Sequence, residues 1–133
     1  NSGTTVQSTA GSVNLHCGDD LLIESGVAVL ATGDVNIEID HGNADAGIGG
    51  RAVVLSELGG TNAFITGYGD PDFVRIVPSS TTSILANGAN PPSAPGDTFY
   101  YYGFGEPPAF DVEAINFEAG GLDQPEQSKW TID

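Results

Sequence analysis

Acidic and amide side chains gather in two glycine-rich segments of the sequence. Asp40, Asn43 and Asp45 lie in the segment DHGNADAGIGG, and Asp70 and Asp72 lie in GYGDPDF. Calcium takes about six to eight oxygen ligands from carboxylates and carbonyl groups, so these five residues are candidate calcium ligands. The competing interpretation is that Asp and Asn serve turn geometry, because both hydrogen-bond nearby backbone and tolerate left-handed conformations. The EF-hand spacing is not met anywhere in the chain.

The imidazole and thiol side chains are few. His16, Cys17 and His41 are the complete set in the chain. A zinc site would need them to converge in space with one or two carboxylates, and nothing in their spacing demands that. We therefore expect no zinc site. Cys17 is expected to be a small buried residue at a corner of the fold.

A catalytic site is not expected. The tightest combination of acid and base is Arg75 beside Asp70 and Asp72. Successive side chains on a strand point to opposite faces, which separates Arg75 from Asp72. The chain has no Gly-x-Ser-x-Gly elbow, phosphate loop or HExxH motif. The sequence therefore predicts a protein without enzymatic activity.

An aromatic run, FYYY at residues 99–102, is the second candidate binding feature. Tyr100 and Tyr102 would project outward if Phe99 and Tyr101 face the core. Exposed tyrosines bind sugars and proteins, because each offers a flat apolar ring and a hydroxyl group. The alternative is an aromatic cap over one end of the fold.

The charge of the chain excludes two classes of partner. Its 133 residues carry a formal net charge of −15. That balance excludes phosphate-led nucleic-acid binding and a polybasic membrane anchor, and no apolar run is long enough to span a membrane. The near absence of lysine among many Asp, Asn, Gly, Ser and Thr residues suits an extracellular or cell-surface location. The chain begins without Met, so we expect a removed signal peptide or a fragment of a longer secreted chain.

Short apolar runs separated by Gly, Asp or Asn predict an all-β protein. Gly11–Leu15 (GSVNL) returns as Gly33–Ile37 (GDVNI), an offset of 22 residues. Two further short strands, Asp20–Glu24 and Val27–Ala31, lie between these copies. Three short strands per period is typical of a right-handed parallel β-helix, or solenoid, here of about four coils. An antiparallel β-sandwich is the alternative, because it also has short strands between turns.

The later strands can be assigned to the same three positions. We expect residues 52–55 to take the third position of the second coil and residues 60–62 to open the third coil. Residues 72–77 and 82–86 then supply its second and third strands, and residues 97–103 return to the first position. The segments 40–50 and 87–96 are predicted surface excursions. Residues 1–133 form a single module, in which 120–133 are a polar tail or cap.

Several short motifs resemble repeat modules of very large secreted bacterial surface and adhesin-like proteins. They are found at Gly42–Gly47, Gly67–Pro78, Thr82–Gly88, Pro91–Thr98 and Phe117–Glu118. The resemblance covers about residues 10 to 118. It implies a parallel β-helical, non-catalytic module, of a kind often grouped with haemolysin-type calcium-binding repeats. The calcium β-roll pattern is matched incompletely and in one copy, because Thr66 replaces its first glycine, so we do not expect a true β-roll.

The expected function is a structural or adhesive module of an extracellular bacterial surface protein, with calcium as a candidate stabilising ion. Its expected partners are neighbouring modules of the same or identical chains, and glycans or a cell-surface protein. The alternative is a carbohydrate-binding or carbohydrate-active β-helix domain that uses the tyrosines and the acidic loops.

Overall fold

The computed structural model describes residues 3–43, 45–77, 79, 81–89, 97–101, 117–118 and 129–132. All regular secondary structure in these residues consists of β-strands. The described part of the chain contains no helix that is long and apolar enough to cross a membrane. The strands are β1 (Thr5–Ser8), β2 (Val13–His16), β3 (Asp20–Ile23), β4 (Ala28–Ala31), β5 (Val35–Glu38), β6 (Arg51–Val54), β7 (Leu58–Gly59), β8 (Asn62–Thr66), β9 (Phe73–Ile76), β10 (Ser83–Asn87), β11 (Thr98–Tyr101), β12 (Phe117–Glu118) and β13 (Lys129–Ile132).

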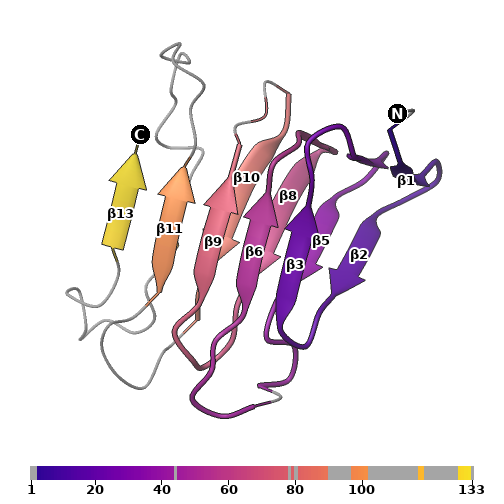
Figure 1. Ribbon diagram of the computed structural model, residues 1–133. Coiled ribbons are helices and arrows are strands. Elements are labelled where there is room, and N and C mark those ends of the chain that lie inside the picture. Colours follow the sequence, from indigo (N-terminus) through magenta and orange to yellow (C-terminus); the bar gives the residue numbers. More distant parts are fainter. Residues whose placement is uncertain are drawn as a thin grey trace.

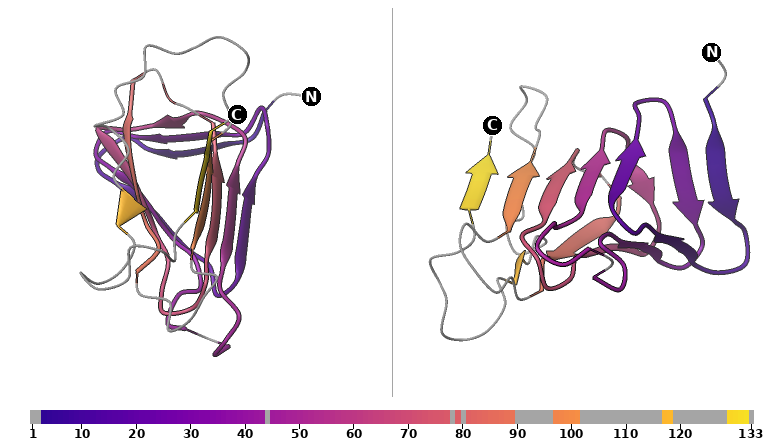
Figure 2. Two further views of the ribbon diagram at one scale, coloured as in Figure 1. Left: turned by 90° about the vertical axis from the view of Figure 1, so that its left-hand side faces the viewer. Right: turned by 60° about the horizontal axis from the view of Figure 1, so that its bottom comes forward.

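The strands form three sheets. Sheet 1 has the order β1-β4-β7, sheet 2 has β12-β10-β8-β5-β2, and sheet 3 has β13-β11-β9-β6-β3. Sheet 3 lies in front of sheet 2 in Figure 1, and the three sheets enclose a roughly triangular core in the left view of Figure 2. Every described strand pair is parallel. The antiparallel β-sandwich alternative is therefore wrong.

From β2 to β7 the chain visits sheet 2, sheet 3 and then sheet 1, and after β7 the described strands alternate between sheets 2 and 3. We call each pass that begins in sheet 2 a round. The first round is β2, β3 and β4, and the second is β5, β6 and β7. Val13 pairs with Val35, which matches the offset of the sequence repeat. The all-β prediction and the start of the third round at Asn62 agree with this order.

Three later strand assignments were wrong. Residues 51–54 pair with β3 in the second position, residues 83–87 pair with β8 in the first, and residues 98–101 pair with β9 in the second. The strand in the third position of the second round is only Leu58–Gly59. Two residues cannot show alternation, so residues 52–55 were assigned to the third position in place of this strand. No described strand lies in sheet 1 between β9 and β10, so residues 82–86 were assigned to the third position in the same way.

The core consists of apolar columns in which each residue stacks on its partner in the next round. One column of sheet 2 is Val13, Val35, Ala63 and Ile84, and a neighbouring one is Leu15, Ile37, Ile65 and Ala86. In sheet 3, Ala52, Val74 and Phe99 stack in the same way. These residues are buried except for Leu15, which belongs to the first round. Because every strand is only a few residues long, its burial depends on the rounds above and below it.

Candidate functional site

All five candidate calcium ligands lie at one corner of the molecule, where the chain passes from sheet 2 to sheet 3. The connection from β5 to β6 carries Asp40, Asn43 and Asp45, and the connection from β8 to β9 carries Asp70 and Asp72. The parallel pairing of β5 with β8 and of β6 with β9 stacks the two connections. We call this region the acidic corner. Segments that are about 25 residues apart in sequence thus meet in space.

Asp72 faces the interior of the acidic corner. Its side chain is buried, its Oδ1 accepts a hydrogen bond from the Gly50 N–H at 2.7 Å, and its Oδ2 accepts one from the Tyr68 N–H at 2.9 Å. The buried Asp97 repeats the arrangement one round later, because its Oδ1 accepts from the Asp72 N–H at 2.9 Å. Both oxygens of Asp72 are engaged by backbone N–H groups, so the geometry gives Asp72 a structural role.

Burial is the main influence on these two carboxyl groups. It raises the pKa of Asp72 to about 7 against the opposing effect of the two backbone hydrogen bonds, and the nearby Asp97 adds to the rise. Burial also raises the pKa of Asp97 to about 6, and its Oδ2 has no hydrogen-bond partner. Desolvation favours the neutral form of an acid. The interior of the corner therefore holds two acids that take up protons near neutral pH.

Glycines make room for these carboxylates. A Cβ atom at Gly67 would lie 1.8 Å from Asp72 Oδ2, and one at Gly88 would lie 2.2 Å from Asp97 Oδ2. One round earlier the arrangement is reversed, because Ile39 is fully buried and a Cβ at Gly50 would lie 2.9 Å from Ile39 Cβ. Each round thus places one large side chain opposite one glycine at this corner.

A second group of side chains, which we call the outer acidic corner, brings together Asp40, Asn43 and Asp70, of which Asp40 and Asp70 are also buried. With its amide oriented to donate, Asn43 Nδ2 lies 2.9 Å from Asp70 Oδ2 and 3.3 Å from Asp40 Oδ2. Asp70 Oδ2 also accepts a hydrogen bond from the Gly47 N–H at 2.8 Å. Asp40 and Asn43 have positive φ angles of 51° and 53°, so they also serve the turn geometry of the competing interpretation.

Asp45 completes the outer group, and its neighbour is Asp19, an acid in the turn before β3. Burial, followed by repulsion from Asp19 and Asp70, raises the pKa of Asp45. Asp45 Oδ1 is enclosed and has no hydrogen-bond partner. Asp19 comes from the preceding round, between β2 and β3. Only the stacking of rounds brings Asp19 near Asp45, so the pairing of these two acids is not visible in a single sequence segment.

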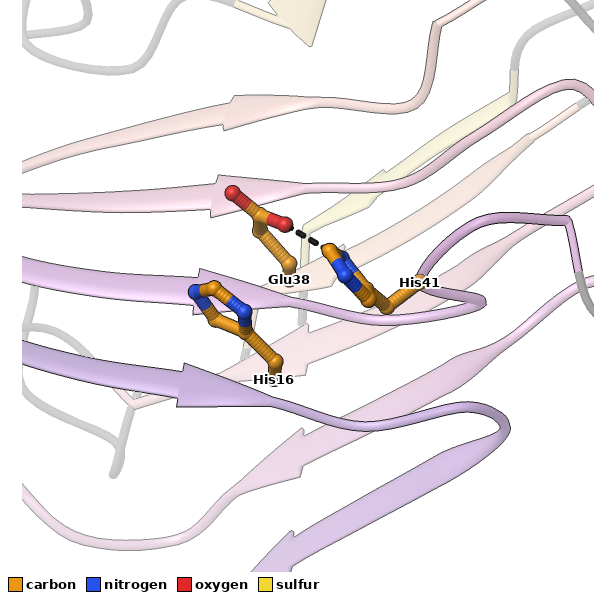
Figure 3. A group of neighbouring side chains, drawn as sticks. All are labelled: His16, Glu38 and His41. Carbon is orange, nitrogen blue, oxygen red and sulfur yellow. Dashed lines mark hydrogen bonds and ion pairs between the residues drawn. The ribbon is translucent and has the colours of Figure 1, made fainter.

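A second cluster, His16, Glu38, His41 and Tyr68, lies at the β5 end of the same corner, and Figure 3 shows its first three members. His41 Nδ1 is 2.6 Å from Glu38 Oε2, and the two imidazole rings have centroids 4.6 Å apart. The Tyr68 hydroxyl donates to Glu38 Oε2 at 3.2 Å. The hydrogen bond from His41 lowers the pKa of Glu38 in spite of partial desolvation. The spacing of these residues in the sequence does not demand this convergence, which arises from the parallel register of β2 and β5 and from the turn after β5.

Cys17 follows His16 in the chain and is half-buried. Its N–H donates to the Glu38 carbonyl, and its own carbonyl accepts from the His41 N–H, both at 2.9 Å. Partial burial raises the pKa of the thiol. Cys17 therefore contributes its backbone to the position of His41 and Glu38, at the corner where the sequence placed it.

The tyrosine face lies on sheet 3. Phe99 is buried and Tyr100 faces outward, where the guanidinium of Arg75 lies 5.4 Å from its ring centroid. One strand earlier in sheet 3, the guanidinium of Arg51 on β6 lies 5.3 Å from the ring centroid of Phe73 on β9. Arg75 points away from the buried Asp72, as strand alternation predicts. Tyr102 lies outside the described residues.

Comparisons with protein-family models, with curated protein sequences and with solved structures gave no match for this chain.

Proposed function

We propose that the chain is a right-handed parallel β-helix module that serves as a non-catalytic structural and adhesive unit of a secreted bacterial surface protein. The single observation that carries this proposal is the continuous in-register stacking of rounds. Backbone hydrogen bonds between parallel strands are supplemented by side-chain hydrogen bonds between residues 22 positions apart. For example, Asn36 Nδ2 donates a hydrogen bond to Asn14 Oδ1 at 2.7 Å. Such ladders make a stiff rod, because each coil is held by its two neighbours.

The end of the molecule formed by β1 and the first round supports stacking onto a further module. Val6 keeps 40 % of its surface exposed, whereas Val29 and Leu58, its successors in the same column, are each 1 % exposed. Leu15 and Leu21 of the first round are also only partly buried. Apolar columns that continue to an open end favour a second set of coils as the partner, of the same or an identical chain.

Association through this end can be measured by analytical ultracentrifugation at increasing protein concentration. We expect the chain to self-associate in about 0.5 M NaCl, where salt screens the repulsion between copies that each carry a net charge of −15. Val6→Lys should abolish the association, because it puts a charge in the end column. Leu22→Lys, at an outward-facing residue that is 57 % exposed, is the matched control. A monomer at every concentration, or equal loss in both variants, would contradict stacking through this end.

Calcium stabilisation belongs to the same proposal. The outer acidic corner supports it through the proximity of Asp40, Asn43, Asp45 and Asp70 and through the raised pKa of Asp45. In the absence of an ion, the amide of Asn43 bridges two carboxylates, which is a position where a cation would relieve their repulsion. Rotation of this amide would then present its oxygen as a further ligand.

We expect a melting temperature several degrees higher in millimolar calcium than in sodium chloride of equal ionic strength. A ligand at a hundredfold excess over its dissociation constant stabilises the native state by about 2.7 kcal/mol. Asp45→Ala should remove the increase, whereas Glu24→Ala, at an exposed acid between β3 and β4, should keep it. If calcium raises the melting temperature equally in the unmodified chain and in both variants, or in none of them, these acids serve only turn geometry and solubility.

Carbohydrate binding is the second candidate function. The observation that favours it is the outward face of sheet 3, where Phe73 and Tyr100 each lie next to an arginine. Aromatic rings beside guanidinium groups offer stacking and hydrogen bonding to a sugar. Binding on a glycan array that disappears in Tyr100→Ala, in a chain that does not self-associate, would favour this function over the first.

A further inference from the structure

Three side chains with strong metal-binding groups converge beside the acidic corner. His16 ends β2, Glu38 ends β5, and His41 lies in the turn that follows β5. Each offers one ligand atom, and the three atoms all lie within 4.8 Å of one another. Figure 3 shows the imidazole of His41 next to the carboxylate of Glu38 and the ring of His16 on the neighbouring strand. We propose that His16, Glu38 and His41 bind one divalent transition-metal ion of the zinc type.

The donor set selects the class of metal. Two imidazole nitrogens and one carboxylate oxygen suit zinc and its neighbours in the first transition row, whereas calcium and magnesium prefer oxygen ligands alone. This site is therefore distinct in its chemistry from the oxygen-rich outer acidic corner. Three protein ligands leave the fourth tetrahedral position of zinc to water.

The backbone already holds the three ligands in place. His16 and Glu38 are directly paired in register on adjacent parallel strands, so their side chains leave the same face of sheet 2. The His41 N–H donates to the Cys17 carbonyl at 2.9 Å, which ties the turn to the first round. The positive φ of Asp40 bends the chain back immediately before His41. Binding therefore requires little ordering of the backbone.

The distances require only small side-chain rotations. Ligand atoms around a tetrahedral zinc lie about 3.3 Å apart, because each metal–ligand bond is about 2.0–2.1 Å. The hydrogen bond of 2.6 Å between His41 Nδ1 and Glu38 Oε2 must open slightly, and the ligand nitrogen of His16 already lies within 4.8 Å of the other two ligand atoms. The side chains of His41 and Glu38 are 44 % and 31 % exposed, so both have room to rotate.

Tyr68 acts as a positioning residue for this site. Its hydroxyl lies 3.2 Å from Glu38 Oε2 and 3.1 Å from His41 Nδ1, so it contacts two of the three ligand groups. Hydrogen bonds to ligating carboxylates fix their orientation, and losing such a partner costs about 10–100-fold in metal affinity. A bound ion would also join the first and second rounds of sheet 2 to the turn that opens the acidic corner.

The test is a titration of the chelator-treated full chain with zinc chloride near pH 7.5, followed by calorimetry. We expect one zinc ion per chain, and a loss of at least about tenfold in affinity for each of His16→Gln, Glu38→Gln and His41→Gln. Glu24→Gln removes the same charge as Glu38→Gln from an exposed position and should bind zinc as the unmodified chain does. Magnesium in place of zinc should give no saturable site.

Cobalt(II) provides a readout that does not depend on the variants being folded. Bound to the unmodified chain, it should give the intense visible absorption of a four-coordinate ion, and one equivalent of zinc should remove this absorption. Zinc affinity that is equal in all four variants would instead indicate adsorption to an acidic surface and would overturn the proposal. The absence of saturable zinc binding, or a weak six-coordinate cobalt spectrum, would overturn it as well.

Discussion

A second copy of residues 13–34 inserted after Asp34 is expected to fold in place and to raise the melting temperature by several degrees. The insert is one complete round, because Val13 pairs with Val35 and Leu15 pairs with Ile37. Each strand of the copy therefore finds parallel partners in the register that the native rounds use. In stacked repeats the stability is approximately a sum of repeat and neighbour-interface contributions, so one more buried round adds a net stabilising increment.

The new contacts in this variant resemble native ones. Val13, Asn14 and Leu15 of the first round would meet their own copies, which replace Val35, Asn36 and Ile37 with nearly the same side chains. The asparagine ladder that joins Asn36 to Asn14 can extend through the insert. The column that begins at Val13 gains one more buried member. The expected result depends on this similarity, because a mismatched round would leave cavities in the core.

A half-round insert is the control. A second copy of residues 13–23, placed after Ile23, contains strands for sheets 2 and 3 and none for sheet 1. It must either loop out or break the order of the sheets, so its melting temperature should fall below that of the unmodified chain. Thermal unfolding followed by circular dichroism measures both variants. A fall of similar size in both would contradict independent, stackable rounds.

The repeat in the sequence predicted the parallel arrangement, but only where the rounds are regular. The copies GSVNL and GDVNI differ conservatively, and their residues do lie opposite one another on β2 and β5. The pattern failed after the eleven residues of segment 40–50, which lengthen the connection to β6. Apolar alternation is alike in strands of all three sheets, so it identifies a strand and not the sheet to which that strand belongs.

The candidate site was predictable to the extent that its residues are close in sequence. The glycine-rich loops pointed to Asp40, Asn43 and Asp70, which do meet. The loops gave no sign that Asp72 faces inward or that Asp97 repeats its role. Both depend on a glycine at the start of the same connection, Gly67 for Asp72 and Gly88 for Asp97. The cluster around His16 was missed because the register of β2 and β5 brings its members together. This register cannot be read from the spacing of residues within one segment.

The stability of the protein is expected to decrease as the pH rises from about 4 to about 8. The buried carboxyl groups of Asp72 and Asp97 have pKa values raised from the ordinary 3.8 to about 7 and about 6. Between the unfolded and folded values, the native state therefore binds protons that the unfolded chain has released. Under this condition the free energy of unfolding falls with increasing pH, because deprotonation leaves a desolvated charge in the core. One pKa unit corresponds to about 1.4 kcal/mol, so the expected loss is on the order of a few kcal/mol.

Asp97→Asn tests the origin of this pH dependence in urea unfolding measured at several pH values. The amide oxygen can still accept from the Asp72 N–H, and the amide nitrogen replaces the oxygen that has no partner. This variant should gain stability at pH 8 relative to the unmodified chain and should show a shallower decline. It also removes the negative charge that helps to raise the pKa of Asp72. Glu24→Gln, at an exposed acid between β3 and β4, controls for the general repulsion in a chain of net charge −15. An identical pH profile in the unmodified chain and in Asp97→Asn would show that the buried carboxyl of Asp97 does not determine the decline.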